Sequence, residues 1–340
     1  MSLVRQQLKD AGLGCHKEFL GLPEFLGYAI HIRESPLDNG KIKEEYVMTG
    51  EDKKLFPLLQ YTRHVVRTQF ISAQSLSQVV GSWTWFMLLN RPLLCIFETV
   101  YAFIRKYWYA RYKPFPMWDS VLAELMCVLG CLPFFEANLS IEWSDIAYEV
   151  DAGPQRVAYV RSKAKVTELR VAARLAERGG WLLPADEGGA TDLGALFRER
   201  QAHPPTAADF FLDVGPEKPI EVTDNWFPAS RWALVLAHDL ARPEHNTISE
   251  VRAAVEALVH FARSSRCWHR RLLLLSDAAA AIGCLSKGRS GSVQCNRLCR
   301  RAAAAIFYAD IRVYYRWVAS EHNNADGPSR GFRFACVDPG

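Results

Sequence analysis

The chain has 340 residues, of which 49% are hydrophobic and 23% charged, so it can bury a sizeable core and its length suggests two or three domains. The net charge of +4 is a mild basic bias, compatible with nucleic-acid binding without being evidence for it. The nine cysteines form no CxxC motif, and no histidine completes a zinc set, so we expect buried thiols in a reducing compartment.

No signal peptide is expected at the N-terminus, because charged and apolar residues alternate within Met1–Gly14. The most apolar stretch, Val79–Phe97, is interrupted by Asn90-Arg91-Pro92 and falls short of the ~20 residues that a membrane helix needs. We therefore expect a soluble, intracellular protein of the cytoplasm or nucleus, with no membrane partner.

The N-terminal half carries two successive patterns. Turn signals dominate residues 1–43, where Phe25–Ile32 is predicted to be a strand. Apolar residues then recur at helical spacing. This periodicity predicts a helical domain of about four helices, over Leu55–Thr68, Ser75–Leu89, Leu93–Tyr109 and Trp118–Leu129.

Short strands begin near Ile141. The first two, Ile146–Val150 and Arg156–Val160, flank a predicted hairpin turn. A charged helix over 163–178 leads into Gly179–Pro228, which has the composition of an irregular insertion. The remaining predicted elements, in chain order, are strand Trp232–Ala237, helix Glu250–Phe261, strand Leu272–Leu275, helices Ala278–Leu285 and Ser292–Tyr308, and strand Arg312–Val318.

This order of elements predicts an α+β or α/β fold with a mixed five-stranded sheet. Its first three strands would be antiparallel, and helical crossovers would lead to the last two. The ends of the first and fourth strands would then be neighbours, which brings Asp151 close to Asp277. The helix that Glu250 opens would place its first turn at the same end of the sheet.

Four acidic residues are candidates for a metal site: Asp151, Glu250, Asp277 and Asp326. Each has a simpler explanation by itself, namely a turn residue, a first-turn helix charge, a helix cap and a loop acid, respectively. Clustered carboxylates repel one another, and divalent cations relieve that repulsion. Two Mg²⁺ ions ~4 Å apart activate a water and stabilise the leaving oxygen of a phosphodiester, with Mn²⁺ as a second candidate.

Residues 141–330 resemble the ribonuclease H domain of retroelement polyproteins. The matching segments are Tyr148-Glu149-Val150-Asp151-Ala152, Ile248–Ala253, Leu274-Leu275-Ser276-Asp277 and Trp317–Arg330, of which the last is the most specific. The resemblance implies a ribonuclease H-like fold, an RNA–DNA hybrid as partner and cleavage of its RNA strand. It also implies that the four acids are catalytic and hold two Mg²⁺ ions.

The N-terminal half is similar to another part of such polyproteins. Asp10–Glu18 with Phe25-Leu26-Gly27 resembles the end of a reverse transcriptase palm, and Val80–Trp85 with Asn90–Leu93 resembles its thumb. The expected domains are a palm remnant (1–50), a helical thumb or connection (51–140) and a ribonuclease H-like domain (141–335) with an insertion at about 163–230. Tyr308-Ala309-Asp310-Ile311 lacks the second Asp of a polymerase loop, so no polymerase activity is expected.

Basic residues near the acids are implied to contact the phosphates of the hybrid. The candidates are Lys287, Arg289, Arg297, Arg300 and Arg301, with Arg111 in the thumb. A solvated charged face explains each cluster as well. Trp83 and Trp85 fit an aromatic helix core better than a duplex contact.

Three functions fit these observations. The leading one is a metal-dependent endonuclease left from a retroelement polyprotein, whose remaining parts would be partners. The second is a decayed copy that folds and binds nucleic acid without turnover, because Gly153-Pro154 and Ala278 follow the acids where relatives carry other residues. The third, a DNA-joining recombinase or integrase, would normally use a different order of acids and lack the thumb.

Overall fold

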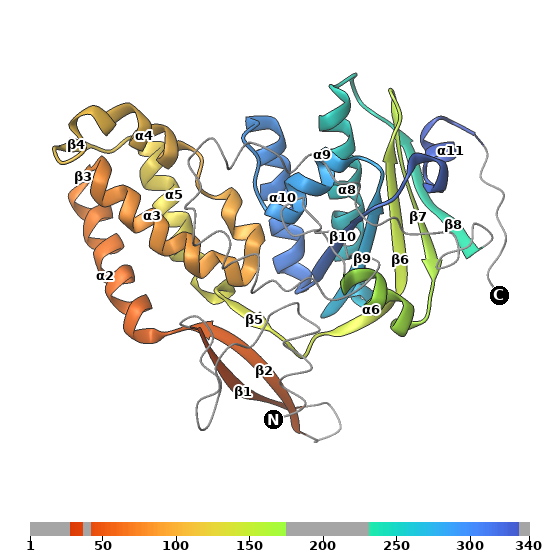
Figure 1. The fold of residues 1–340 in the computed structure, drawn as a ribbon, viewed down its shortest axis with the longest axis horizontal. Helices are drawn as coiled ribbons and strands as arrows, with labels where there is room; N and C mark the ends of the chain where they lie inside the picture. Colours follow the sequence, from red (N-terminus) through yellow and green to blue (C-terminus); the bar gives the residue numbers. More distant parts are fainter. Residues whose placement is uncertain (1–27, 37–41, 175–230, 333–340) are drawn as a thin grey trace, which may run out of the picture.

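The computed structural model describes residues 28–36, 42–174 and 231–332 (Figure 1). The palm-like residues 10–27 and nearly all of the predicted insertion, 175–230, lie outside the described residues. The described chain has a small sheet, a helical part and a larger sheet covered by helices. It is therefore a mixed α+β protein, as the order of elements predicts.

A small antiparallel sheet connects the two ends of the helical part. Strands β1 (Tyr28–Pro36) and β2 (Ile42–Gly50) pair along their length, and β5 (Glu136–Asn138) adds to β2. Tyr28 stacks on Trp85 with ring centroids 4.2 Å apart, so the small sheet packs against the helical part.

The helical part confirms the four predicted helices and changes their limits. They are α2 (Asp52–Thr68), α3 (Ala73–Met87), α4 (Thr99–Tyr107) and α5 (Asp119–Gly130), with a 3₁₀ segment at Leu88–Cys95 and a short hairpin of β3 (Phe70–Ser72) and β4 (Pro114–Pro116). Trp83 is fully buried here, and its Nε1 donates to Thr62 Oγ1 at 3.0 Å. Trp83 is therefore a core residue, the explanation that the sequence favoured.

The third helix begins later than the apolar spacing predicts. Helix α4 starts at Thr99, and a bend of 110° separates it from the preceding helical segment. The cause is Glu124 of α5, whose carboxylate accepts hydrogen bonds from the backbone N–H groups of Glu98, Thr99 and Val100 at 2.9–3.0 Å. These N–H groups have no intrahelical partner at a helix start, so a buried carboxylate there defines where the helix begins.

The larger sheet has the predicted topology. Its strands are β6 (Glu142–Ala152), β7 (Arg156–Lys163), β8 (Trp232–Asp239), β9 (Arg270–Ser276) and β10 (Arg312–Trp317), in the order β10-β9-β6-β7-β8. The pairs β6–β7 and β7–β8 are antiparallel, whereas β9 pairs parallel with both β6 and β10. This mixed five-stranded sheet is consistent with a ribonuclease H-like fold.

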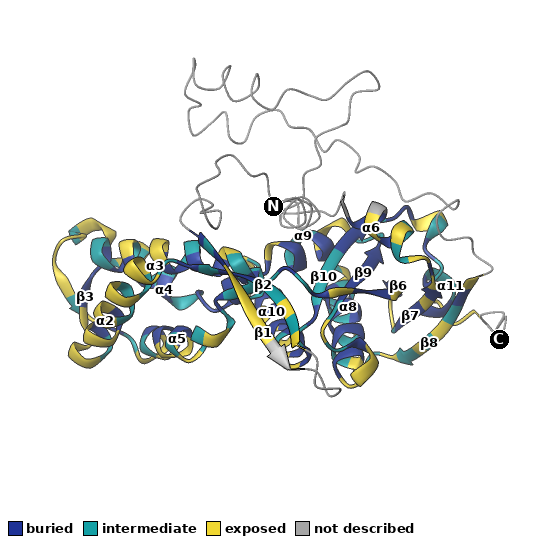
Figure 2. Cartoon of the chain, turned by 90° about the horizontal axis from the view of Figure 1, so that it is seen from below, coloured by how far each residue is buried: buried dark blue, intermediate teal, exposed yellow. Residues whose placement is uncertain are grey.

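Helices cover both faces of this sheet. Helices α8 (Asn246–Ala262), α9 (Ala279–Lys287) and α10 (Val293–Ala309) contribute to the apolar cluster on one face, and α6 (Val166–Arg174) to the cluster on the other. Along β9, Leu272 and Leu274 join the first cluster, while Leu273 and Leu275 join the second. A strand buried on both faces reads as a continuous apolar run, which explains the four consecutive leucines. Figure 2 shows the contrast between buried β9 and the more exposed edge strand β8.

Among the described residues, no single helix is long and apolar enough to cross a membrane. The segments Ala73–Cys95 and Thr99–Ala110 pass a test of length and composition only when taken together across their bend.

Candidate metal centre

Two of the candidate acids come from neighbouring parallel strands. Asp151 is the second-last residue of β6, and Asp277 follows the last residue of β9. The register pairs Glu149 with Leu275, two residues before each acid, so both carboxyl groups reach the same end of the sheet. The predicted topology therefore accounts for this juxtaposition.

Glu250, the third candidate acid, lies on helix α8, which contacts β6. The helix begins at Asn246 with His245 as its N-cap, the ring Nδ1 of which accepts from the Thr247 N–H at 3.3 Å. The expectation that Glu250 opens the helix is therefore wrong, because Glu250 lies in the second turn. One carboxylate oxygen from each of Asp151, Glu250 and Asp277 lies within 4.8 Å of the others.

The electrostatics of this three-carboxylate cluster are unfavourable without a cation. Burial, followed by the charges of Asp151 and Asp277, raises the pKa of Glu250 to about 8, although a backbone hydrogen bond from Ala152 lowers it. Burial raises the pKa of Asp151 to about 6, and the neighbouring Asp277 and Asp326 add to this rise. Within the described part of the chain, Glu250 Oε2 is buried and has no hydrogen-bond partner.

The residues present fit a divalent cation. Carboxylate oxygens are the hard ligands that Mg²⁺ and Mn²⁺ prefer. A buried carboxylate oxygen with no donor is rare in native proteins and costs free energy unless another positive group compensates it. A metal ion within the three-carboxylate cluster would supply that compensation for Glu250 Oε2.

The segment after β10 holds Asp277 in place. The Ser320 hydroxyl donates to Asp277 Oδ2 at 2.6 Å, and Asn323 Nδ2 lies 3.2 Å from Asp277 Oδ1. The same Asn323 amide also lies 3.2 Å from the Val150 carbonyl oxygen, one residue before Asp151. Asn323 therefore links β6 to the end of β9 beside the carboxylates.

The same segment holds Asp151 through the short helix α11 (Asp326–Ser329). The Ser329 hydroxyl donates to Asp151 Oδ2, and this hydrogen bond lowers the pKa of Asp151 against the effect of burial. Asn324 donates from its backbone N–H and its Nδ2 to Glu149 Oε2, at 2.9 and 3.0 Å. These residues belong to the motif Trp317–Arg330, from which the sequence predicted only Asp326 as a site residue. The polar residues on either side of Asp326 could have indicated the others.

Gly153 is required by the approach of α11. A Cβ at this position would lie 2.5 Å from the Ser329 carbonyl oxygen. Real Cβ atoms essentially never come that close to backbone, so only glycine fits between the β6–β7 turn and α11. Gly153, one of the residues that suggested a decayed copy, is therefore explained by the packing of α11 against the β6–β7 turn.

Asp326 lies near the cluster but outside its group of three. Its Oδ1 accepts from Arg330 Nε at 2.7 Å, and Arg330 Nη2 is also 2.7 Å away. The charge of Asp326 still raises the pKa values of Asp151 and Glu250. The structure thus brings three of the four predicted acids together and leaves the fourth beside them in an ion pair.

The predicted nucleic-acid contacts fall into three groups. Lys287, Arg289, Arg297 and Arg301 are exposed on α9, α10 and the connection between them. Arg300 is exposed as well, but its guanidinium donates to the carbonyl oxygens of Cys95 and Ile96 at 3.1 Å and so joins α10 to the helical part. Arg111 follows α4 in the connection to the β3–β4 hairpin, and α4 and β4 lie at the opposite end of the molecule from α11 (Figure 1).

No protein-family model and no curated protein matches this chain. Among solved structures, it is similar to a foamy viral protease-reverse transcriptase in complex with an RNA/DNA hybrid, with 11% identity and a TM-score of 0.22 over 90% of this chain. The match covers 51% of that structure's chain, so the present chain spans about half its length. The fold and site themselves define the class: an α+β protein with a mixed five-stranded sheet and a carboxylate cluster that could bind a metal ion.

Proposed function

We propose that this chain is a metal-dependent nuclease that cleaves the RNA strand of RNA–DNA hybrids. One observation carries the proposal: carboxylates from β6, β9 and α8 converge within 4.8 Å, and the Glu250 Oε2 among them is buried without a donor. Burial and neighbouring carboxylates raise the pKa values of both Asp151 and Glu250. Buried like charges that raise one another's pKa values are typical of functional sites.

Asp151, Glu250 and Asp277 would hold the metal, with Asp326 completing a second position after exchange of its Arg330 partner. Bound Mg²⁺ or Mn²⁺ ions would activate a water and stabilise the leaving oxygen of the phosphodiester. Around them, Ser329 orients Asp151, while Ser320 and Asn323 orient Asp277. Glu250 holds a proton near neutral pH until a cation takes its place, because its pKa is about 8.

The substrate follows from charge and from the sequence resemblance. Lys287, Arg289, Arg297 and Arg301 are exposed and would contact the phosphate backbone. A hybrid would be recognised through its shape and the 2′-hydroxyls of its RNA strand. We propose no role of this kind for Arg300, since its guanidinium donates two hydrogen bonds of 3.1 Å to backbone carbonyls of the helical part, whereas Arg289 makes one of 3.4 Å to the Tyr101 hydroxyl.

The proposed organisation keeps the predicted limits: a palm remnant at 1–50, a helical thumb or connection at 51–140 and a ribonuclease H-like domain at 141–335. The apolar clusters of the helical part and of the larger sheet are distinct except at Cys95 and Phe307, which supports the last boundary. The remainder of a retroelement polyprotein is the proposed partner, and the proposed location is intracellular. A decayed copy that folds and binds nucleic acid without turnover is the alternative; of the residues that suggest it, the approach of Ser329 explains Gly153.

A cleavage assay with one end-labelled strand in each substrate tests the proposal. The substrates are an RNA–DNA hybrid, the same RNA as a duplex with RNA, and a DNA duplex, each with Mg²⁺ or with EDTA. Only the hybrid with Mg²⁺ should be cut. Asp277→Asn should lower the cleavage rate by more than roughly 100-fold, because even the mutation of a residue that only supports a metal ligand lowers activity by about 10–100-fold.

The matched control is Asp310→Asn, the same substitution at the end of α10, where the carboxylate contacts His269 at 3.0 Å. This variant should cleave at the rate of the unmodified protein. Equal cleavage by Asp277→Asn and Asp310→Asn, or cleavage that persists in EDTA, would overturn the proposal.

A further inference from the structure

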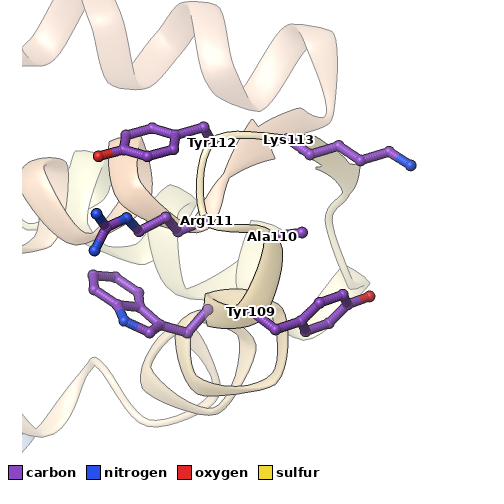
Figure 3. A pocket seen from close by; sticks show the side chains of 6 residues that line it. Tyr109, Ala110, Arg111, Tyr112 and Lys113 are labelled. Atoms are coloured by element: carbon purple, nitrogen blue, oxygen red, sulfur yellow. The ribbon is translucent and has the colours of Figure 1, made fainter.

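A second candidate site lies at the end of the helical part opposite α11. The tip loop, Trp108–Lys113, connects α4 to β4 and has the sequence Trp-Tyr-Ala-Arg-Tyr-Lys (Figure 1). Its six residues line a shallow hollow of about 500 Å³ (Figure 3). None of them belongs to the carboxylate cluster.

The backbone of the tip loop is held before any ligand arrives. Lys113 N–H donates to the Ala110 carbonyl oxygen at 2.8 Å, and Gln74 N–H of α3 donates to the Arg111 carbonyl oxygen at 2.9 Å. At the base of the loop, Tyr107 stacks on Phe115 with ring centroids 4.2 Å apart. A loop fixed in this way loses little conformational entropy on binding.

Three aromatic side chains of the tip loop face solvent. Tyr109 is 81% exposed, Tyr112 71% and Trp108 43%. The Arg111 guanidinium lies 4.9 Å from the Tyr112 ring centroid and 5.8 Å from that of Trp108. In Figure 3, Arg111 and Tyr112 project from one side of the loop, and Tyr109 and Lys113 from the other. Large aromatic residues gathered in the open mark an interaction surface rather than a core.

The charge around the tip loop has one sign. Residues 99–118 contain Arg105, Lys106, Arg111 and Lys113 and no acidic residue. Within the described ranges, neither Arg111 nor Lys113 pairs with a carboxylate, and each lies over an aromatic ring instead. Positive charge without a protein counterpart attracts an anionic ligand.

We propose that the tip loop binds an unpaired nucleic-acid strand. Bases stack on Trp108, Tyr109 and Tyr112, while phosphates approach Arg111 and Lys113. Stacking of this kind tolerates any sequence, because every base has a ring face. A duplex hides these faces between its own base pairs, so this ligand differs from the proposed hybrid substrate and the inference does not rest on nuclease activity.

The composition of the tip loop favours a nucleic acid over a membrane surface. Segments that insert into lipid combine cations with aliphatic and aromatic side chains that enter the acyl region. The tip loop has no aliphatic residue larger than Ala110, and its two most exposed rings are tyrosines. Alternating rings and cations instead match the arrangement of bases and phosphates along a single strand.

Fluorescence anisotropy with a short labelled oligothymidylate, in EDTA, tests the proposal on the full chain. Tyr109→Ala/Tyr112→Ala should weaken binding of the single strand by about tenfold or more and leave binding of an RNA–DNA hybrid unchanged. The matched control, Tyr308→Ala on α10, removes an equally exposed tyrosine (71%) and should have no effect. Arg111→Gln/Lys113→Gln should reduce the slope of the logarithm of the single-strand binding constant against the logarithm of salt concentration by about 1.4, because two phosphate contacts are lost.

Three results would overturn the inference. In the first, Tyr109→Ala/Tyr112→Ala keeps an intact circular dichroism spectrum and an unchanged affinity for the single strand. In the second, this variant loses hybrid binding as much as single-strand binding. In the third, the unmodified protein binds phosphatidylcholine–phosphatidylserine vesicles and not the oligonucleotide. Asp277→Asn separates this inference from the proposed function. It should abolish hybrid cleavage and retain single-strand binding, whereas absence of cleavage by the unmodified protein would leave the tip-loop result intact.

Discussion

Replacing Glu250 by glutamine should stabilise the metal-free protein and remove its response to Mg²⁺. Burial and the charges of Asp151 and Asp277 raise the pKa of Glu250 from its ordinary value of 4.5 to about 8. The folded state therefore binds this proton more tightly than the unfolded chain does. Stability should be greatest below pH 4.5 as far as this group is concerned, and should fall as pH rises towards and through about 8.

The size of the effect follows from the same shift. A tenfold change in proton affinity corresponds to about 1.4 kcal/mol, so the rise of the Glu250 pKa sets a ceiling of roughly 5 kcal/mol. Solvent screening of a half-buried side chain reduces this to about 2 kcal/mol above pH 8. The neutral amide of Glu250→Gln escapes this cost, so Tm should rise by about 3 °C at high pH and hardly at all near pH 4.5.

Thermal unfolding followed by circular dichroism, in EDTA and in Mg²⁺, measures both effects. Mg²⁺ at about 100 times its Kd should stabilise the unmodified protein by about 2.7 kcal/mol, and Glu250→Gln by much less. Glu256→Gln on the same helix is the control, because its carboxylate contacts His238 at 2.7 Å and lies outside the carboxylate cluster. A Glu250→Gln protein that is less stable than the unmodified one in EDTA at high pH, or that keeps the full Mg²⁺ stabilisation, would refute this reasoning.

Three further predictions concern the supports of the site and the fold. Ser329→Ala removes the hydrogen bond that lowers the pKa of Asp151, so the acid limb of the cleavage–pH profile should move above about 6. The cleavage rate should fall by roughly 10–100-fold, and Ser329→Thr should restore part of it. Gly153→Ala forces a Cβ against the Ser329 carbonyl and should destabilise the protein by about 1–3 kcal/mol, whereas Gly81→Ala in α3, where the space is open, should stabilise it by about 0.5–1 kcal/mol. Glu124→Gln weakens the acceptor for three N–H groups at the start of α4 and should lower the free energy of unfolding by about 1–2 kcal/mol in urea titrations. An unchanged urea midpoint would contradict the assigned cause of the bend before α4.

Local pattern was enough to predict most elements of the larger sheet. The run Leu272–Leu275 predicts a buried strand because β9 packs on both faces, and the turn residues after Val150 predict the β6–β7 hairpin. The start of α4 was not predictable in this way. It depends on Glu124, which is 25 residues from Thr99 in sequence and meets it only in the folded chain.

The order and type of the elements follow from the amino-acid sequence, and this order predicts Asp151 and Asp277 at the ends of adjacent strands. Their surroundings depend on the folded chain: Glu250 lies in the second turn of α8, Ser329 contacts Asp151, and Arg330 pairs with Asp326. The reason is physical. Periodicity and turn chemistry act over a few residues, whereas the burial of a carboxylate and its hydrogen-bond donors depend on groups far along the chain, as with Ser329 and Asp151, 178 residues apart.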